Sequence, residues 1–492
     1  MTADRMVADH MATGRTSRDW DAIVIGTGPA GMAAAATLAE GGARTLVVDE
    51  QPEIGGQIYR AIERNRDHPR LARILGADYL RGAPLAERLR ASGAEISLGT
   101  LVWRIDEERG VWIRRHGAIE RVSARAVVLA TGAMERPVPM PGWTLPGVMG
   151  IGALQIALKS GGIVPAGRLV LAGSGPLFLL FARQCLAAGI RDMVLLDTSD
   201  SAHLLSGLPL LPRALTGEGW RYLLKGAGLL AVLRRAGVPF YRGVRAIALE
   251  GDRHVTAIRF VHRGGAARLA CDTVGLHEGV IPQQQITRSL GCAHEFYSTQ
   301  GSFRPALGAS GTTDLPGIHV AGDTGGIIGA QASAHDGNIA ALAILRDIGR
   351  LAPEAAERRI GAETRARHAH LTVRPFLDRL YPPRAEVLAP PDDTVICRCE
   401  NVTAGALREA VGRGVTGPNQ AKAFLRCGMG PCQGRLCGPT ATAIIAAATH
   451  RSPEETGYYR VRTPLKPVTV GELAGLAGHG APNAERDRER PS

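Results

Sequence analysis

Short runs of apolar residues alternate with helix-like segments along most of the chain. The sequence DAIVI at 21–25 is almost wholly apolar, which is typical of a strand buried on both faces of a sheet. The alanine-rich segment 32–40 predicts a helix that ends at two glycines, and TLVVD at 45–49 predicts a second strand. A strand, a helix and a strand of these lengths predict a βαβ unit and an α/β fold.

The turn that joins the first strand to the helix is GTGPAG, residues 26–31. Gly26 allows a tight turn, Gly28 lets the backbone come close to a pyrophosphate, and Gly31 lets the helix pack closely on the strand. The helix begins at Pro29-Ala30 and would direct its positive dipole end toward the phosphates. Such a turn is typical of dinucleotide-binding sites when an acid accompanies it.

A carboxylate at the end of the second strand completes such a site, because it can accept hydrogen bonds from ribose hydroxyls. Asp49 occupies this position, and Glu50 is a competing candidate. With the glycines, the helix, both strands and an acid in place, we predict dinucleotide binding rather than a plain turn.

Residues 94–122 alternate between polar and apolar side chains and predict a small antiparallel excursion. The chain returns with AVVLATGAMERP at 126–137, which predicts a buried strand that ends at Thr131 and Gly132. Arg136 follows this strand. The sequence leaves open whether its guanidinium approaches a phosphate or pairs with an acid.

A second βαβ pattern runs from 168 to 197. Gly173 and Gly175 allow the turn to form, but Phe178 occupies the position of the third glycine and would keep the helix farther from the strand. We therefore expect this unit to be structural or to hold another nucleotide. A working nicotinamide site is the alternative.

The stretch GIHVAGD predicts a further strand that ends at Gly322 and Asp323, followed by a glycine-rich turn and a helix of small residues. A carboxylate in this position can hold a ligand hydroxyl while the helix N-terminus faces a phosphate. His335 and Asp336 lie at the start of that helix, where a polar pair is more often a cap than a catalyst. We therefore name no catalytic residue.

Composition excludes several classes of protein. The 492 residues predict two to four domains. No run of about 18 apolar residues and no signal-peptide pattern occurs, so we expect a cytoplasmic protein without a membrane span. The net charge is +12, but no basic patch interleaved with aromatics is present, so we expect arginine-rich solvated surfaces rather than a nucleic-acid partner.

The eight cysteines are unevenly distributed. Cys185, Cys271 and Cys292 are scattered, and a scattered cysteine is usually a small buried hydrophobe. The other five fall between 397 and 437. In a chain of this size, such clustering favours a metal site over disulfides.

The predicted metal ligands form a C-x-C pair and a C-x4-C pair, namely Cys397, Cys399, Cys432 and Cys437. Four thiolates can ligate one zinc ion or one [2Fe–2S] cluster. The C-x-C spacing is tighter than the usual zinc knuckle, which favours the [2Fe–2S] cluster. Cys427 is a spare sulfur that could replace a ligand, and we expect it to be a buried bystander.

The motifs named above, together with Gly55-Gly56-Gln57, resemble the two-dinucleotide-binding-domain (Rossmann-like) flavoprotein fold of the glutathione and thioredoxin reductase type. The cysteine pattern resembles the small helical [2Fe–2S] domain of the bacterioferritin-associated ferredoxin (BFD) type. These resemblances imply bound FAD and a [2Fe–2S] cluster. The implied FAD contacts are Gly26, Gly28, Pro29, Ala30, Gly31, Asp49, Glu50, Gly56, Gln57, Thr131, Gly132, Gly322 and Asp323. Gly173 and Gly175 would face NAD or another nucleotide, and this second site stays open.

The resemblances also imply the domain organisation. We expect a flexible leader, a discontinuous FAD-binding domain, a second Rossmann-like domain, a linker or docking segment, a BFD-like domain and a tail. In that order they span 1–18, 19–150 with 285–345, 151–284, 346–394, 395–450 and 451–492.

The chain departs from the disulfide reductases in one respect. Those enzymes pass electrons to a redox-active cysteine pair near the flavin, whereas no cysteine occurs here before Cys185, which is alone. We therefore expect the electrons to leave by another route, and the cluster of cysteines near the C-terminal end is the candidate.

A flavoprotein half followed by a BFD-like domain resembles the α subunits of heteromeric amino-acid dehydrogenases and oxidases. This family includes opine oxidase, D-hydroxyproline dehydrogenase, the proline dehydrogenase complex and hydrogen cyanide synthase. The resemblance implies a hetero-oligomer in which a D-amino-acid-oxidase-like β subunit oxidises the substrate. It further implies that electrons pass through this chain to an acceptor. An FMN at the subunit interface and a small ferredoxin-like third subunit stay open.

Two other classes of function remain. One is a self-contained NADH-dependent reductase that uses its own cluster, and the other is a non-enzymatic iron-storage or assembly module. The large flavoprotein half argues against the second. The sequence does not identify the amine or amino acid that the complex would oxidise.

Overall fold

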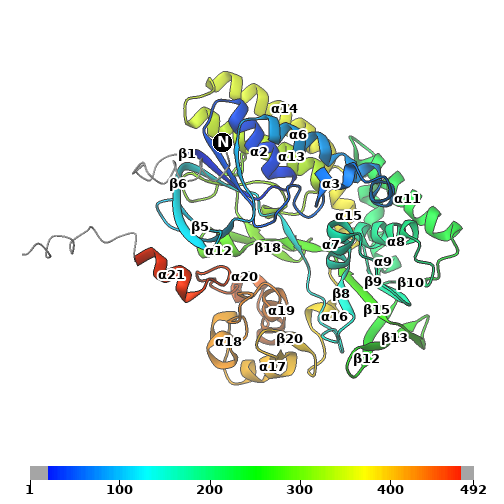
Figure 1. Cartoon of the computed structure of the whole chain (residues 1–492). Coiled ribbons are helices and arrows are strands. Elements are labelled where there is room, and N and C mark those ends of the chain that lie inside the picture. Colours follow the sequence, from blue (N-terminus) through cyan, green and yellow to red (C-terminus); the bar gives the residue numbers. More distant parts are fainter. Residues whose placement is uncertain (1–19, 478–492) are drawn as a thin grey trace, which may run out of the picture.

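The computed structural model describes residues 20–477, and Figure 1 shows two α/β lobes with a small helical domain near the C-terminal end. The α/β class predicted from the sequence is therefore confirmed. The predicted leader lies outside the described residues, as does the end of the predicted tail.

The first lobe contains a mainly parallel sheet whose central strand is buried from Ala22 to Ile25, as the apolar run in its sequence predicts. Leu129 pairs with both Ile25 and Val320, so three strands end at one edge of this sheet. Ligand sites in open α/β sheets lie at such an edge. The parallel strands are β1 (Trp20–Ile25), β2 (Thr45–Val48), β3 (Glu95–Ser97), the second half of β6 (Ala118–Leu129) and β19 (Ile318–Val320).

The antiparallel excursion predicted for 94–122 is present. The first half of β6 pairs antiparallel with β5 (Gly110–Arg115), which pairs with β4 (Leu101–Ile105). One long strand thus belongs to the parallel sheet at one end and to the antiparallel arm at the other.

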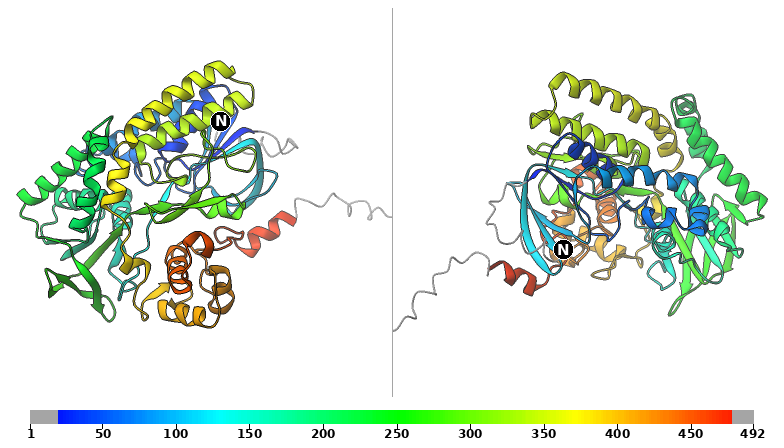
Figure 2. Two further views of the ribbon diagram at one scale, coloured as in Figure 1. Left: turned by 180° about the vertical axis from the view of Figure 1, so that it is seen from behind. Right: turned by 45° about the horizontal axis from the view of Figure 1, so that its top comes forward.

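Helices of small residues cover the first sheet. Helix α2 (Pro29–Glu40) packs against α13 (Ala330–Asp347), and a Cβ at Gly337 would lie only 2.1 Å from the Ala30 carbonyl oxygen. Figure 2 shows α13 beside α14 (Pro353–Leu371) on the outside of this lobe. Shorter helices complete the lobe: α3 (Ile62–Arg66), α4 (Pro69–Leu75), α5 (Ala77–Leu80), α6 (Gly82–Ala91) and α12 (Gln285–Ser289).

The second lobe contains a parallel sheet in the order β11-β10-β9-β15-β8. Its helices α7 (Ile151–Gly161) and α8 (Pro176–Ala188) continue the apolar core of the first lobe, so the two lobes are packed together. The strands are β8 (Val148–Gly150), β9 (Leu169–Ser174), β10 (Met193–Asp197), β11 (Phe240–Arg242) and β15 (Thr273–Glu278).

Several smaller elements extend the second lobe or connect it to the first. The two connecting strands, β7 (Ala133–Glu135) and β16 (Val280–Pro282), pair antiparallel between the lobes. Helix α11 (Gly219–Arg235) exposes Trp220 and Leu224. The others are α9 (Ser201–Gly207), η1 (Leu208–Leu210), α10 (Leu211–Ala214), β12 (Arg245–Gly251), β13 (Val255–His262), β14 (Gly265–Ala270), β17 (His294–Tyr297) and β18 (Ser302–Pro305). The turn η2 (Gly322–Thr324) belongs to the first lobe, where it follows β19.

Residues 346–394, predicted as a linker or docking segment, contain three packed helices. Helix α14 packs on α13, and α15 (Arg374–Leu380) packs against the helices of the second lobe. The short helix α16 (Ala385–Leu388) then leads to the C-terminal domain. This segment therefore joins both lobes, and its role in docking a partner stays a prediction.

The C-terminal domain has its own apolar core, which includes Ile396, Leu407 and Ile445. The predicted N-cap is present, because Thr403 Oγ1 accepts a hydrogen bond from the backbone N–H of Ala406 at 3.2 Å. The elements are β20 (Val395–Cys397), β21 (Val402–Thr403), α17 (Ala404–Gly412), α18 (Pro418–Leu425), α19 (Gly438–Thr449), α20 (Pro453–Thr456) and α21 (Val470–Ala477).

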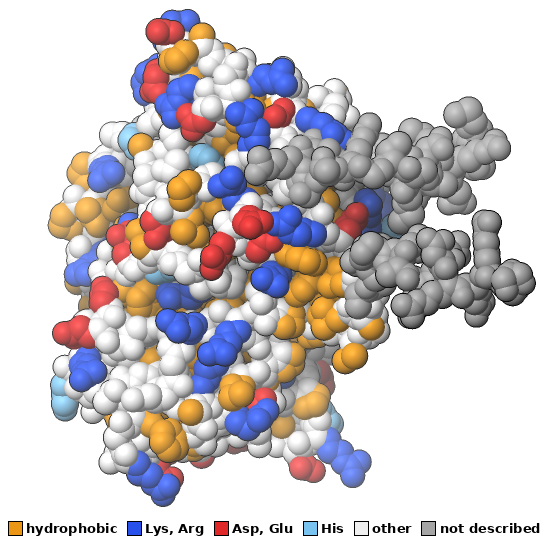
Figure 3. Space-filling view, turned by 90° about the vertical axis from the view of Figure 1, so that its left-hand side faces the viewer, with side chains coloured by type: hydrophobic (Ala, Val, Ile, Leu, Met, Phe, Trp, Pro, Cys, Tyr) orange, Lys and Arg blue, Asp and Glu red, His pale blue; other side chains and the backbone are white. Residues whose placement is uncertain are grey.

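Among the residues that the structure describes, no helix combines the length and apolar character that crossing a membrane requires. Figure 3 shows one face of the molecule, on which Lys and Arg side chains are interspersed with acidic and apolar ones.

Candidate functional site

The GTGPAG turn has the backbone geometry that its glycines predict. Gly26 has a φ of 104°, and a Cβ there would lie 2.4 Å from the Ala130 carbonyl oxygen. A Cβ at Gly31 would lie 1.8 Å from the Gly26 oxygen. The fold itself requires both glycines. Gly28 differs, because its φ is −70° and a Cβ there would meet only Gly56 Cα, at 4.0 Å. Glycine at this position leaves room for a ligand beside the N-terminus of α2.

A second glycine turn lies against the first. A Cβ at Gly56 would lie 2.7 Å from Gly28 Cα, so the two turns touch. Gln57 follows, and its backbone carbonyl accepts a hydrogen bond from Lys159 Nζ at 3.0 Å. Arg60 Nη2 donates to Gln57 Oε1 at 3.0 Å. The buried side chains of Lys159 and Arg60 therefore hold Gln57 in place beside the GTGPAG turn.

Lys159 lies on α7 and connects the two lobes. It is 3% exposed, and within residues 20–477 its ammonium donates to two neutral acceptors, the Gln57 carbonyl and Gln155 Oε1. Burial, reinforced by the charge of Arg60, lowers the pKa of Lys159 to about 7. Burying a charged lysine whose only acceptors are neutral costs free energy of folding. Lys159 is therefore expected to affect the stability of the protein in a pH-dependent way.

The two acids proposed for ribose binding have different environments. Asp49 Oδ2 accepts hydrogen bonds from the backbone N–H and the hydroxyl of Thr27, at 2.7 and 2.6 Å. Glu50 instead forms an ion pair with Lys466 of the C-terminal segment. A cavity of about 360 Å³ lies beside Glu50 and is lined by Gln51, Leu101 and Arg114 among others.

The ATG and AGD motifs meet at the edge of the first sheet. The Gly132 N–H donates to Thr324 Oγ1 at 2.6 Å, and the hydroxyls of Thr131 and Thr324 lie 3.3 Å apart. The Gly322 N–H donates to Asp336 Oδ2 at 2.8 Å. The structure thus brings together motifs that are far apart in the sequence.

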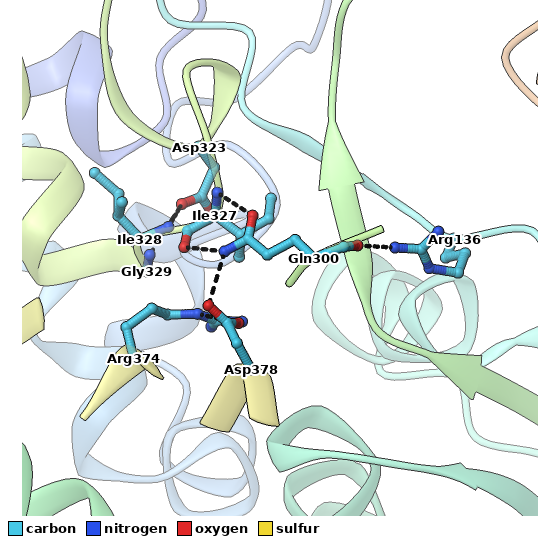
Figure 4. Close-up of polar contacts among 8 residues, drawn as sticks. All are labelled: Arg136, Gln300, Asp323, Ile327, Ile328, Gly329, Arg374 and Asp378. Carbon is cyan, nitrogen blue, oxygen red and sulfur yellow. Dashed lines mark hydrogen bonds and ion pairs between the residues drawn. The ribbon is translucent and has the colours of Figure 1, made fainter. Parts of the chain in front are cut away.

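Asp323 follows directly and caps the turn before α13, as Figure 4 shows. Its Oδ1 accepts from the N–H groups of Ile328 and Gly329, at 2.8 and 2.9 Å. Burial raises the pKa of Asp323, and these hydrogen bonds oppose that rise. Sequence reasoning missed Gln300, whose side chain exchanges hydrogen bonds with the Ile327 backbone and donates to Asp378 of α15.

The structure gives contacts to two residues whose roles the sequence left open. The guanidinium of Arg136 donates to the carbonyls of Gln300 and Gly301, so its hydrogen bonds go to the backbone rather than to an acid (Figure 4). His335 Nδ1 lies 2.6 Å from Glu363 Oε2 on the neighbouring α14. Arg136 therefore joins the end of the 126–137 segment to the loop at Gln300 and Gly301, and His335 joins α13 to α14.

The glycine turn of the second βαβ unit differs from that of the first. A Cβ at Gly173 would lie 1.9 Å from the His277 carbonyl oxygen, so the fold requires this glycine. Gly175 has a φ of 97°, and a Cβ there would meet no described atom within 4 Å. Phe178 is 1% exposed and packs edge-on against Phe240 at a centroid distance of 6.4 Å. Phe178 therefore fills the core of the lobe.

The five clustered cysteines come together in the C-terminal domain. The sulfurs of Cys397, Cys427 and Cys437 all lie within 4.8 Å of one another. Hydrogen bonds from the Cys427 and Cys437 thiols lower the pKa of Cys397. Burial raises the pKa of Cys399; a hydrogen bond from the Cys432 backbone opposes that rise, and the contact with the Cys432 sulfur adds to it. The donor set is wholly sulfur, which suits an iron–sulfur cluster or zinc.

Of the predicted ligands, Cys397 and Cys437 form one contacting group together with Cys427, and Cys399 contacts Cys432. Cys427 is fully buried, as expected, but its sulfur is a full member of the first group.

Comparisons with known proteins agree with this geometry. Residues 20–337 match the pyridine nucleotide-disulphide oxidoreductase family, and residues 395–447 match the BFD-like [2Fe-2S] binding domain. The crystal structure of L-proline dehydrogenase from P. horikoshii has the same fold, with a TM-score of 0.65 at 20% identity over 94% of this chain and 81% of that chain. The fold and site define an FAD-dependent oxidoreductase with a built-in [2Fe–2S]-type domain, and the predicted fold class is confirmed.

The sequence relatives are more specific. The A subunit of opine oxidase from Rhizobium meliloti (strain 1021) is 48% identical over 93% of this chain and 99% of its own length. The HcnB subunit of hydrogen cyanide synthase from Pseudomonas protegens is 34% identical over 91% of this chain and 96% of its own length. The chain belongs to the family of opine oxidase A subunits, as the resemblance in its sequence indicates.

Proposed function

We propose that this chain is the electron-transfer component of a heteromeric flavin-dependent dehydrogenase or oxidase. The substrate would be an amino acid or secondary amine of the opine, hydroxyproline or proline type. One observation carries the proposal: a flavoprotein loop and a five-cysteine site occupy separate domains of a single chain. The names of the similar proteins support it, since they are subunits of opine oxidase and of hydrogen cyanide synthase.

The chain's own residues would hold two cofactors. The open backbone at Gly28, the N-terminus of α2 and the region of Asp323 fit an FAD, whose bound form would supply two-electron chemistry. The sulfurs gathered in this domain fit a [2Fe–2S] cluster, which is held by four cysteine thiolates and would supply one-electron transfer. The inferred ligands are the four cysteines that the sequence predicts, Cys397, Cys399, Cys432 and Cys437, with Cys427 beside Cys397 and Cys437.

The partner in this proposal is a β subunit of the D-amino-acid-oxidase type, which would bind the substrate and remove hydride from the carbon next to nitrogen. The present chain would relay the electrons to an acceptor. An FMN at the interface and a small ferredoxin-like third subunit belong to the same proposal. The assembly would be a hetero-oligomer in the cytoplasm.

The test is to tag this chain in its own host, purify it gently, and identify the polypeptides that accompany it by mass spectrometry. The expected result is a stoichiometric flavoprotein of the amino-acid-oxidase type, whose pocket would define the substrate search. An isolated chain that carries flavin and cluster and is bleached by NADH would contradict the proposal and favour the self-contained reductase. The glycine turn at Gly175, where a Cβ would meet no described atom within 4 Å, is the observation that keeps this alternative in view.

A further inference from the structure

The segment 457–467 lies outside both ranges that match known families, yet it joins the cysteine domain to the first lobe. At its far end, the Leu465 N–H donates to the Trp103 carbonyl at 2.9 Å, and Lys466 pairs with Glu50. Arg435, on the cysteine loop, donates to the Leu465 carbonyl at 3.2 Å. The position of this segment is therefore fixed by contacts with both domains.

The near end of the segment inserts Tyr459 into the cysteine loop. Its ring is 1% exposed and lies against two glycines of that loop. A Cβ at Gly428 or at Gly434 would approach ring atoms of Tyr459 to 2.6 Å. Both glycines therefore make room for this ring, which shows that the tyrosine is a built part of the cysteine site.

The Tyr459 hydroxyl is directed at sulfur. It donates to Cys427 Sγ at 3.2 Å and accepts from the Cys437 thiol at 3.7 Å. A phenol is protonated at neutral pH, so it can donate a hydrogen bond to a thiolate. Cys437 is a ligand in the set inferred above, and Cys427 adjoins that sulfur.

We propose that, once Cys437 is a deprotonated ligand, the Tyr459 hydroxyl, 3.7 Å away, donates its hydrogen bond to Cys437 Sγ and thereby raises the reduction potential of the iron–sulfur cluster. Hydrogen bonds to the sulfurs are among the factors that set such potentials, because they stabilise the extra negative charge of the reduced cluster. Tyr459 would be a positioning residue, acting on the cluster through its ligand. This inference rests on the proposed [2Fe–2S] function of the domain.

The experiment uses the full chain and the variant Tyr459→Phe, which keeps the ring against the glycines and removes only the hydroxyl. Iron and labile sulfide are quantified first, and the potential is then measured by a redox titration followed by electron paramagnetic resonance. We expect full iron and sulfide with a potential shifted to more negative values.

Tyr458→Phe is the matched control. The Tyr458 hydroxyl faces the Gly434 carbonyl at 3.5 Å, and its ring lies under the Arg288 guanidinium, so its loss should leave the potential unchanged. An unchanged potential in Tyr459→Phe, or equal shifts in both variants, would overturn the inference alone. A wild-type chain that holds no iron would overturn the proposed function and this inference with it. If Tyr459→Phe loses part of its iron, the residual clusters are examined by resonance Raman spectroscopy. Iron–sulfur stretching bands at the wild-type positions would overturn the inference, and shifted bands would support it.

Discussion

One carboxylate oxygen of Asp49 accepts two hydrogen bonds from Thr27, one from the backbone N–H and one from the hydroxyl. Thr27 is the residue between the first two glycines of the GTGPAG turn, and it is fully buried. Asp49 therefore holds the turn in shape, whereas the neighbouring Glu50 reaches Lys466 at the surface. The sequence could not distinguish these two roles, because both acids follow the same strand.

We expect Asp49→Asn to weaken FAD binding by at least about tenfold. A hydrogen bond to a charged group contributes about 1.5–3 kcal/mol, and each 1.4 kcal/mol corresponds to about a factor of ten in affinity. The measurement is the dissociation constant for FAD, obtained by titrating apoprotein and following flavin fluorescence. Glu50→Gln is the matched control and should bind FAD nearly as the wild type does. The role assigned to Asp49 is wrong if the two variants show the reverse order.

The cysteine site makes a prediction that separates Cys427 from its neighbours. Serine variants of Cys397, Cys399, Cys432 and Cys437 should each lose iron and labile sulfide while retaining flavin, because each removes one of four ligands. Cys427→Ser should keep the cluster, because the predicted ligand set is complete without Cys427, although its sulfur lies beside those of Cys397 and Cys437.

Iron, labile sulfide and FAD are measured on the same preparations, so that loss of cluster is distinguished from general misfolding. A Cys427→Ser variant without iron, next to a Cys432→Ser variant with full iron, would show that Cys427 is a ligand and Cys432 is not.

The sequence predicted correctly those elements whose structure is determined by residues close to one another in the chain. The first βαβ unit, the antiparallel arm at 94–122 and the Thr403 cap follow from periodicity, glycine spacing and capping chemistry. Each of these features is fixed by residues close in sequence.

Contacts between distant segments could not be predicted in this way. The prolines and charges of 346–394 indicated a linker or docking segment, but they did not reveal that α14 packs on α13 of the first lobe and α15 on α9 of the second. The hydrogen bond of Tyr459 with Cys427 likewise depends on a tail that has no recognisable motif. Arg136 finds its carbonyl acceptors on a hairpin that its own sequence neighbourhood does not reveal.

Lys159 gives the stability of the protein a specific pH dependence. Its pKa is lowered to about 7 in the folded chain, whereas an unfolded lysine has a pKa near 10.4. Between about pH 7 and pH 10 the unfolded chain therefore binds a proton that the folded chain lacks, so stability rises with pH across this window. Below about pH 7 both states are protonated, and the cost of burying the charge is fully present.

We expect the difference in melting temperature between the wild type and Lys159→Met to move in favour of the wild type as the pH rises from about 7 to about 10. Scanning calorimetry at one scan rate measures this difference. Lys225→Met is the control, because Lys225 is an exposed lysine paired with Asp78. A wild-type curve that stays parallel to the Lys159→Met curve would show that Lys159 remains charged when buried.

The last prediction concerns the attachment of the 346–394 segment to the second lobe. Arg384 Nε donates to Glu278 Oε1 at 2.7 Å, and the Glu278 side chain is 1% exposed. Arg384→Met would leave this carboxylate buried without its counter-charge, which costs about 3–5 kcal/mol. We expect a loss of that size in the free energy of unfolding, measured from the denaturant transition of the second lobe.

The double variant Arg384→Met with Glu278→Met should recover most of that loss, because apolar groups can replace a buried ion pair. Arg413→Met, which removes an exposed helical pair with Glu409, should cost less than about 0.5 kcal/mol. Equal effects of the two arginine variants would mean that the Arg384 pair does not fix the segment, and that α14 and α15 are held by their apolar contacts instead.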